Sequence, residues 1–487
     1  MASVNPDLSF VDAAHAFAAK NRSKFIFKAL KYYTGCNDYE LDFLIKKIYC
    51  TSISSSEYLK ETFIKKYLGV LLLPLFFLIN KRWNWKQERP VDYNFETVDR
   101  SYFDSRFSVI YDNLTGSKRI TPRIQGSHLR GDVTEPVTSA IHIRSLVLLF
   151  IIAPAVIFPL YAFCLQNRIN ILRAYRASLA AYAEFDGYFK RYPCKSFITY
   201  ADDTNHPSYY IAFKQNCAGN MIVIQNGERS YHPRWSFGML DVYFIFGESY
   251  IDMIRRLGYH VGYAIPVGSL ALNQYYHLLQ NMDEEHLFDI LYIDNGSICP
   301  PSYGGLTEEV AKSEEIILSH LNKFKSIYKN LKIAYQLRNY DSEQKEQVLS
   351  ILRNILSDDI EILDNSGQGE SYRNIRKSNL VINFQSTMGF EAFMLGKKAL
   401  FVNYFGHSNQ TLCYDSLFQI EDETHDFELF EERVKCLLDL NLDKIPDFAI
   451  KRHYAFDGQV QERIAKAISE IQAGGCDDKK YSLARSI

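Results

Sequence analysis

The chain lacks the cysteine patterns that disulfide scaffolds and zinc sites require. Its nine cysteines are scattered over 487 residues, with no Cys-x-x-Cys pair and no Cys/His spacing typical of a metal site. An odd, unpatterned set of this kind is typical of core packing in a reducing compartment. We therefore expect neither disulfides nor a structural metal.

The sequence also has little net charge and no obvious targeting or repeat signal. The formal net charge is −2, so the chain lacks the global positive field of a nucleic-acid-binding protein, and no nucleic-acid partner is expected. The first ten residues contain no basic stretch followed by an apolar core, and no signal peptide is predicted. No internal repeat or low-complexity segment is present, and the length suffices for two or three domains with large cores.

The most informative segment lies between two apolar runs, at 380–383 (LVIN) and 399–402 (ALFV). Its pattern predicts strand, small-residue turn, helix and strand, with Ser386, Thr387 and Gly389 where the helix begins. Free N–H groups and the positive end of the helix dipole meet there, which suits a phosphate or diphosphate. Glu391 follows in the first turn, where it can accept hydrogen bonds from a ribose or sugar hydroxyl. An ordinary N-capped helix explains the same segment about equally well.

Residues 286–440 alternate strand-like and helix-like segments, which predicts a parallel, doubly wound sheet. Ligands of such sheets bind beyond the carboxyl ends of the strands. The candidate donor-binding residues follow predicted strand ends: Asn295, Gly296, Arg338, Ser386, Thr387 and, in a later loop, His407. The Arg338 guanidinium could pair with a phosphate through two parallel hydrogen bonds, and a solvated charge is the equal alternative. The loop of His407 is expected to close over the nucleotide.

Residues 196–268 repeat this alternation, and a segment at 106–111 (RFSVIY) is expected to add a first strand. Two nucleotide-binding-like halves joined near 270–285 predict a two-lobed enzyme with a central cleft. Polar residues again follow the predicted strand ends, namely Asp202, Asp203, His206, Gln225, Asn226, Glu228, Glu248 and Ser269.

Three motifs in 190–405 resemble those of GT-B glycosyltransferases of the bacterial surface-polysaccharide and O-antigen type. They are the turn Gln225-Asn226-Gly227 after a strand, Phe246-Gly247-Glu248 with a later Gly268-Ser269, and Ser386-Thr387-x-Gly389-x-Glu391-Ala392 followed by Gly396-Lys397-Lys398. The resemblance implies an α/β fold with two Rossmann-like lobes, here with added N-terminal helices and an apolar membrane-associated insertion. The chain departs from the pattern at Asn226, where many relatives carry His. Some relatives transfer 3-deoxy-octulosonic acid or sialic acid from CMP donors, and the motifs do not fix the donor.

Glycosyl transfer needs a carboxylate near the anomeric carbon and positive or N–H groups at the leaving phosphate. Glu228 or Asp202 is the candidate general base or nucleophile, with Asp203 and His206 in support. Gln225, Asn226, Glu248 and Ser269 are assigned to the acceptor side or the cleft. No spaced Asp-x-Asp motif ends a strand, so we expect a metal-independent reaction with no cofactor besides the nucleotide-sugar substrate.

Two uncharged apolar segments stand apart from this pattern, at 67–79 and 145–165. The second is long enough to span a bilayer, whereas the first is too short. The loop between them is rich in Lys and Arg and is expected to stay on the cytoplasmic side. We therefore expect both segments to dip into the inner leaflet beside the basic flanks Arg168, Arg173 and Arg176. A buried pair of core helices is the alternative.

The predicted division is a helical region at 1–60, an apolar and basic region at 61–185, a first lobe at 186–275, a nucleotide-binding lobe at 286–440, a crossing helix at 441–473 and a flexible tail at 474–487. The predicted function is transfer of a sugar from a nucleotide sugar to a lipid-linked glycan at the cytoplasmic face of the bacterial inner membrane. The alternatives are a sugar-nucleotide 2-epimerase of the same fold and a non-catalytic, membrane-associated assembly protein.

Overall fold

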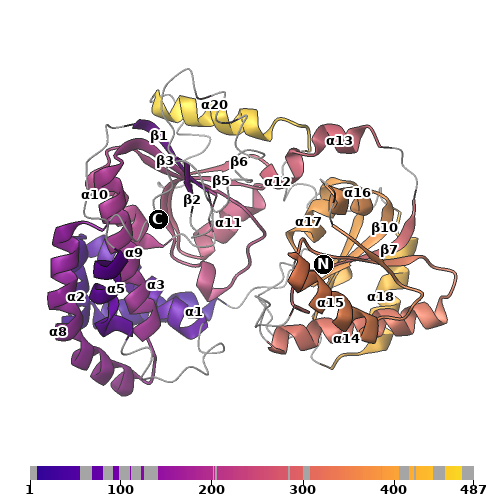
Figure 1. The fold of residues 1–487 in the computed structure, drawn as a ribbon, viewed down its shortest axis with the longest axis horizontal. Coiled ribbons are helices and arrows are strands. Elements are labelled where there is room, and N and C mark those ends of the chain that lie inside the picture. Colours follow the sequence, from indigo (N-terminus) through magenta and orange to yellow (C-terminus); the bar gives the residue numbers. More distant parts are fainter. Residues whose placement is uncertain are drawn as a thin grey trace.

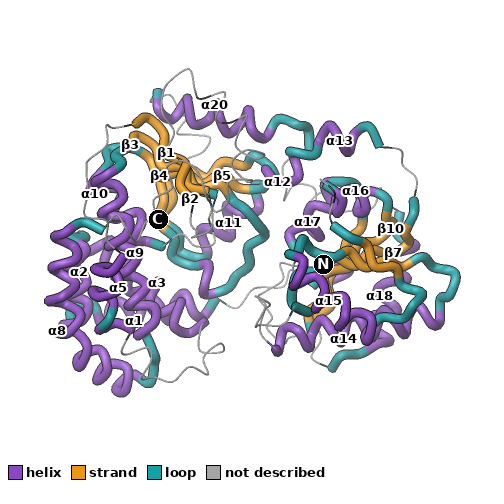
Figure 2. Tube along the Cα trace, in the orientation of Figure 1, coloured by secondary structure: helices purple, strands orange, loops and turns teal. Residues whose placement is uncertain are grey.

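Two parallel sheets organise the chain. The structure, a computed structural model, describes residues 8–54, 69–80, 91–97, 110, 114, 122–124, 141–200, 202, 206–282, 286–299, 308–365, 367, 369–384, 386–404, 416–421, 424–441 and 456–473. Within these ranges, one six-stranded sheet has the order β2-β1-β3-β4-β5-β6 and the other β12-β11-β10-β7-β8-β9. Each sheet is the centre of one lobe, and the two lobes lie side by side (Figures 1 and 2). The predicted α/β architecture with two Rossmann-like lobes is confirmed.

The interior strands of the first sheet contain apolar runs, at 221–224 (MIVI) and 242–245 (VYFI), whose residues are buried on both faces, as parallel strands require. Its strands are β1 (Val91–Thr97), β2 (Pro122–Ile124), β3 (Cys194–Thr199), β4 (Asn220–Ile224), β5 (Met239–Ile245) and β6 (His260–Pro266). The expected strand at 106–111 lies outside the described residues except for Ile110, which is helical. Instead β1 pairs with β3, with Val91 opposite Cys194. In β1, VDYNFET, apolar Val91, Tyr93 and Phe95 alternate with polar residues, a period-two strand pattern that was overlooked because the segment has no continuous apolar run.

The second sheet has the Rossmann strand order. Its strands are β7 (Phe288–Ile293), β8 (Ile333–Gln336), β9 (Glu361–Leu363), β10 (Ser378–Asn383), β11 (Lys398–Asn403) and β12 (Gln419–Glu421). The connecting helices are α14 (Glu308–Ile327), α15 (Ser342–Ile355), α16 (Glu370–Arg376), α17 (Thr387–Met394) and α18 (Phe427–Asp439). From β7 the chain proceeds outward to β9, then returns to pair β10 with β7. The strand order reverses between β7 and β10, and open sheets bind ligands at such a point.

Helices cover both faces of the first sheet. On one face lie α1 (Ser9–Asn21), α2 (Phe25–Thr34), α3 (Asp38–Ser54), α5 (Leu73–Asn80), α8 (Ile143–Asn167), α9 (Leu172–Arg191) and α10 (Pro207–Asn216). The other face packs against α20 (Val460–Gln472), whose Ile464 and Ile468 share a core with Ile198 of β3. α20 therefore lies over the first lobe (Figure 1), and Arg463 ties it there by donating to the Val267 carbonyl at 2.8 Å.

The apolar segments form helices α5 and α8. α8 continues through Pro154 and Pro159 over 25 residues. It is the one helix among the described residues that is long and apolar enough to cross a membrane, and 44% of its most apolar stretch is buried. Most of the basic loop between the two segments, like the tail at 474–487, lies outside the described residues.

Candidate functional site

The switch point of the second sheet is flanked by two polar turns, one after β7 and one after β10. The turn after β10 begins α17. Ser386 caps this helix, because its Oγ accepts from Met388 N at 3.3 Å while its own N–H donates to Asn383 Oδ1 at 3.0 Å. Gly389 is required here, since a Cβ at this position would lie 2.2 Å from Asn383 Nδ2. Asn383, a buried residue that the sequence did not single out, therefore shapes the turn.

The turn after β7 is organised by Asp294. This buried carboxylate accepts from Gly296 N and from the Tyr340 hydroxyl, both at 2.7 Å. Gly296 has φ +88°, a left-handed conformation that favours glycine. Arg338 is exposed and lies against this turn, where its Nη1 donates to the Asn295 carbonyl at 3.1 Å. Asn295, Gly296 and Arg338 are thus brought together as predicted from their strand ends.

A buried acid lies behind this turn. Glu314 of α14 is fully buried and accepts hydrogen bonds from the Tyr292 hydroxyl at 2.9 Å and from the Ser297 hydroxyl. Burial is the largest cause that raises the pKa of Glu314, and the nearby charge of Asp294 adds to it. The pKa of Asp294 is also raised by burial. Nothing in the sequence distinguishes Glu314 from the solvated acids of the same helix.

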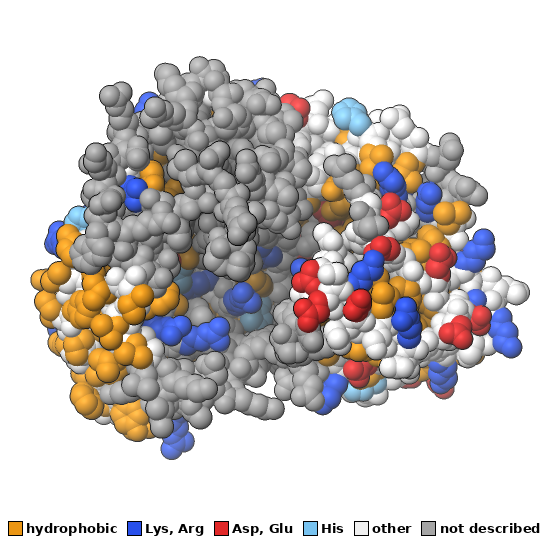
Figure 3. Space-filling model, in the orientation of Figure 1, with side chains coloured by type: hydrophobic (Ala, Val, Ile, Leu, Met, Phe, Trp, Pro, Cys, Tyr) orange, Lys and Arg blue, Asp and Glu red, His pale blue; other side chains and the backbone are white. Residues whose placement is uncertain are grey.

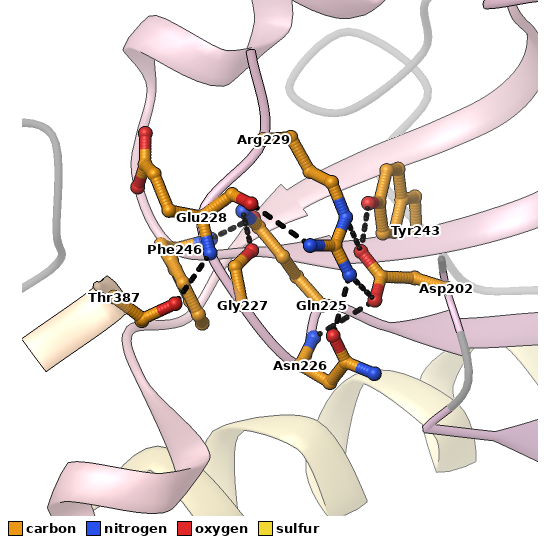
Figure 4. A network of polar contacts seen from close by, with 9 residues as sticks. All are labelled: Asp202, Gln225, Asn226, Gly227, Glu228, Arg229, Tyr243, Phe246 and Thr387. Atoms are coloured by element: carbon orange, nitrogen blue, oxygen red, sulfur yellow. Dashed lines mark hydrogen bonds and ion pairs between the residues drawn. The ribbon is translucent and has the colours of Figure 1, made fainter. Parts of the chain in front are cut away.

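In the first lobe, Asp202 is held by an ion pair (Figure 4). Arg229 Nε donates to Asp202 Oδ2 at 3.0 Å, a second bond joins Arg229 Nη2 to Oδ1, and Tyr243 donates its hydroxyl to Oδ2 at 2.7 Å. Both charged side chains are almost fully buried, and the Trp235 ring lies 4.7 Å from the guanidinium carbon. Asp202, predicted as a possible base or nucleophile, is instead an ion-paired carboxylate, because both of its oxygens are engaged by these donors.

The same network fixes the turn after β4. Asn226 N donates to Asp202 Oδ1 at 3.2 Å, and Asn226 Oδ1 accepts from Arg229. Gln225 is buried and holds the turn through two hydrogen bonds of 2.9 Å. Its side chain donates to the Gly227 carbonyl and accepts from Phe246 N. Gln225 and Asn226 therefore shape the turn that presents Glu228.

Glu228 occupies the position where this turn meets the other lobe. Its backbone N–H donates to Thr387 Oγ1 at 2.8 Å, so the start of α17 lies directly against the turn (Figure 4). The Glu228 carboxylate points away from Arg229 and accepts from the Tyr250 hydroxyl. Tyr250 belongs to α11 (Ser249–Arg256) and was not among the predicted residues.

A second contact joins the lobes nearby. Glu391 is buried, and its carboxylate accepts from the Ser269 hydroxyl of the first lobe and from the Tyr372 hydroxyl at 2.8 Å. Ser269 caps the short helix α12 (Leu270–Asn273) that leads out of the first lobe. The carboxylate predicted to meet a ribose therefore connects the lobes in this conformation.

The other described residues of the prediction, His206 and Glu248, make neither of these contacts between the lobes. His206 caps α10 by accepting from Ser208 N at 3.1 Å, and its other ring nitrogen lies 3.3 Å from Ser178 Oγ of α9. Burial lowers the pKa of His206 to about 3, so it stays neutral and cannot give the predicted acid–base support near neutral pH. Glu248 is exposed at the start of α11. Asp203 and His407 lie outside the described residues.

Two surface hollows lie elsewhere in the described part of the chain. One, of about 630 Å³, is lined by Cys194 and Asn220, and the other, of about 640 Å³, by Asp289 and Asn379. All four residues stand at the amino ends of strands or next to them. Because ligands of open α/β sheets bind at the carboxyl ends, we place the site where α17 meets the turn of Glu228.

Comparison with known proteins links part of the chain to polysaccharide synthesis. Residues 222–419 match a family described as "putative O-antigen biosynthesis protein". No curated protein matches the sequence. Similar solved structures include UDP-GlcNAc 2-epimerase from Neisseria meningitidis bound to UDP-GlcNAc (10% identity, 78% of this chain and 100% of that one, TM-score 0.43). Another is the S. aureus MnaA–UDP structure (12% identity, 79% of this chain and 97% of that one, TM-score 0.46). A third is Acinetobacter baumannii MurG (9% identity, 79% of this chain and 100% of that one, TM-score 0.38). We draw no functional conclusion from structural similarity at this level.

Proposed function

We propose that this chain is a glycosyltransferase that moves a sugar from a nucleotide sugar to a lipid-linked surface glycan. One observation carries the proposal: the start of α17 and the turn of Glu228 meet at 2.8 Å, at the carboxyl ends of both sheets. The start of α17, which suits an anion, and the carboxylate of Glu228 therefore lie next to each other. Transfer from a phosphate leaving group requires both. The match of residues 222–419 to an O-antigen biosynthesis family supports the choice of pathway.

In the proposed step, Glu228 acts as the general base. It takes the proton of the acceptor hydroxyl while the acceptor oxygen forms a bond to the anomeric carbon, and the bond from that carbon to the phosphate oxygen breaks. The nucleoside diphosphate or monophosphate departs with the electron pair of the broken bond. Asp202 is neutralised by Arg229, which leaves Glu228 as the better-placed base of the two predicted carboxylates. One general base is what an inverting transfer needs, and inversion is therefore part of the proposal.

The leaving phosphate is assigned to the switch point. The positive end of the helix dipole at the start of α17 favours the charge of a leaving phosphate. Arg338, which is exposed and donates to the Asn295 carbonyl after β7, is assigned a charge-assisted contact with the same phosphate. No metal is part of the proposal.

Nucleotide binding is the first test. The full chain is melted with CMP, UDP or GDP, each with and without an attached sugar, because a ligand that binds only the folded state raises the melting temperature. We expect one nucleotide to stabilise the wild type and to lose most of this effect in Ser386→Ala/Thr387→Ala. Ser350→Ala, at an exposed serine of α15, should keep the wild-type response. An absence of response to every nucleotide would contradict the proposal.

The reaction itself is tested with the nucleotide sugar so identified. Incubation with a lipid-linked acceptor should give a lengthened glycan, and incubation without acceptor should leave the sugar configuration unchanged. Acceptor-independent change of configuration at C2 would replace the transferase by the 2-epimerase alternative. Binding of the nucleotide with neither reaction would favour the non-catalytic assembly protein.

A further inference from the structure

The outer face of α8 is as apolar as its buried face. Its buried side packs against α2, α5 and α9. The large side chains exposed on the other side recur at helical spacing, and they are Ile143, Val147, Phe150, Ile151, Phe158, Tyr161 and Leu165. Phe158 is 74% exposed. A surface helix of a soluble protein normally turns polar side chains outward, so this face calls for an apolar partner.

Helix α5 extends this surface. It packs against α8, and the large exposed side chains of its segment are Leu71, Leu72, Leu75, Phe76 and Ile79. Ile79 is 82% exposed. Figure 3 shows the resulting patch of hydrophobic side chains over the part of the molecule where Figure 1 places these helices. Isolated exposed hydrophobic residues are ordinary, but a contiguous patch marks an interaction surface.

Basic residues flank this apolar surface. Residues 69–80 carry no charge, and residues 141–183 contain four arginines and no acid. The four arginines, Arg144, Arg168, Arg173 and Arg176, are all exposed. Arg176 reaches the start of the α5 segment, since a Cβ built on Gly69 would lie 2.6 Å from its Nη1. An apolar face with a basic rim complements the headgroups and acyl chains of an anionic leaflet.

The packing of α8 opposes a membrane-spanning arrangement. Ten of its residues are buried, among them Leu149, Val156 and Leu160. Ser145 near its start donates to the buried Asp186 of α9 at 2.7 Å. A spanning helix would give up these contacts, whereas a helix lying in the membrane plane keeps them. A symmetric pair of chains is also disfavoured, because an isologous contact would place the arginine rim against itself.

We propose that α5 and α8 form an in-plane anchor that inserts the exposed side chains of α8 and of residues 71–79 into an anionic membrane leaflet. The anchor keeps the first lobe, and with it the turn of Glu228, at the membrane surface. It deepens the proposed function by placing the enzyme where a lipid-linked acceptor resides, but membrane binding itself requires neither donor nor acceptor.

Vesicle sedimentation tests this anchor separately from catalysis. The full chain is mixed with vesicles of phosphatidylcholine alone or with phosphatidylglycerol, and the bound fraction is measured without nucleotide. We expect binding to the anionic vesicles and a loss of roughly tenfold or more in partitioning for Ile79→Glu/Phe158→Glu, because each large side chain loses its burial in lipid. Ile327→Glu is the matched control, since Ile327 is 51% exposed on α14 of the other lobe and should bind as the wild type does.

A second variant addresses the rim. Arg168→Gln/Arg173→Gln should weaken binding to the anionic vesicles by several-fold, and by much less to the neutral ones. Unchanged binding in both double variants would overturn the anchor. So would a wild type that ignores vesicles but forms dimers by light scattering that Ile79→Glu/Phe158→Glu dissociates. Retained nucleotide-dependent melting shifts in these variants show that the fold and the donor site are intact.

Discussion

The two lobes place polar groups at the same edge of a parallel sheet but use them differently. In the first lobe the charges cancel, because Asp202 and Arg229 form a buried ion pair that fixes the turn after β4. In the second lobe the switch point has an exposed Arg338, helix N–H groups and a buried acid whose pKa is raised. A buried ion pair fixes the turn of the first lobe, whereas the second lobe combines an exposed cation with the positive end of a helix dipole.

This difference assigns complementary tasks to the two lobes. A rigid turn suits a single reactive carboxylate, and Glu228 is presented by such a turn. A switch point with N–H groups and a cation suits a leaving phosphate. The contact of Glu228 N with Thr387 Oγ1 brings the two edges together. Substitutions in the turn of the first lobe and at the switch point of the second lobe should therefore affect different properties of the protein.

Glu228→Gln should produce the largest effect. Removing the base while keeping the size of the side chain is expected to lower kcat by roughly 10²- to 10⁴-fold, the usual contribution of general base catalysis. Nucleotide-dependent stabilisation should persist, because the proposed donor site lies on the other lobe. Asp252→Asn, on the same helix as Tyr250 and 59% exposed, is the control and should retain wild-type turnover. Equal rates for Glu228→Gln and this control would remove Glu228 from the reaction.

Asp202→Ala should destabilise the first lobe without a specific kinetic signature. Breaking a buried ion pair from one side leaves an uncompensated charge and costs about 3–5 kcal/mol. We expect a lower urea midpoint for Asp202→Ala, and partial recovery when Arg229→Met is added. If Asp202→Ala alone were as stable as the wild type, Asp202 would not hold the turn after β4 in place.

The sequence revealed the sheets and the polar strand ends, but it could not show which polar groups are already paired. Long apolar runs such as those of β5 and β10 identify buried parallel strands directly. Asp202 and Glu228 look alike in sequence, and only the fold brings Arg229 and Tyr243 onto the first. Asn383 and Tyr250 were missed for the same reason: their roles come from contacts with residues distant in the chain. β1 was missed because its apolar residues alternate with polar ones instead of forming a continuous run like those of β5 and β10.

Gly389→Ala tests the shape of the second switch point. The added Cβ would lie 2.2 Å from Asn383 Nδ2, so the start of α17 must shift. Overpacking of this kind costs about 1–3 kcal/mol. We expect a modest loss of stability together with a loss of nucleotide-dependent melting shift. Gly396→Ala is a matched glycine with open space around it but φ +69°, and it should lose stability while keeping the nucleotide response. Loss of the response in both variants would not support a special role for Gly389.

Glu314→Gln should have the smallest effect on activity and should instead change how stability depends on pH. Burial raises the pKa of Glu314 above its ordinary 4.5 in the folded chain. At a pH between the ordinary pKa and the raised pKa, the Glu314 carboxyl is protonated in the folded chain but ionised in the unfolded chain. The free energy of unfolding therefore falls as pH rises through this range. Glu314→Gln removes this contribution, and its urea midpoint should decline less than that of the wild type from pH 5 to about pH 8. Asp294 is present in both proteins, so its contribution to the pH dependence cancels to first order when the two curves are compared. Glu315→Gln, an exposed neighbour on α14, should follow the wild-type curve. Parallel curves for Glu314→Gln and the wild type would mean that Glu314 is ionised in the folded chain. The second lobe would then hold the negative charge of Glu314 beside the proposed phosphate site.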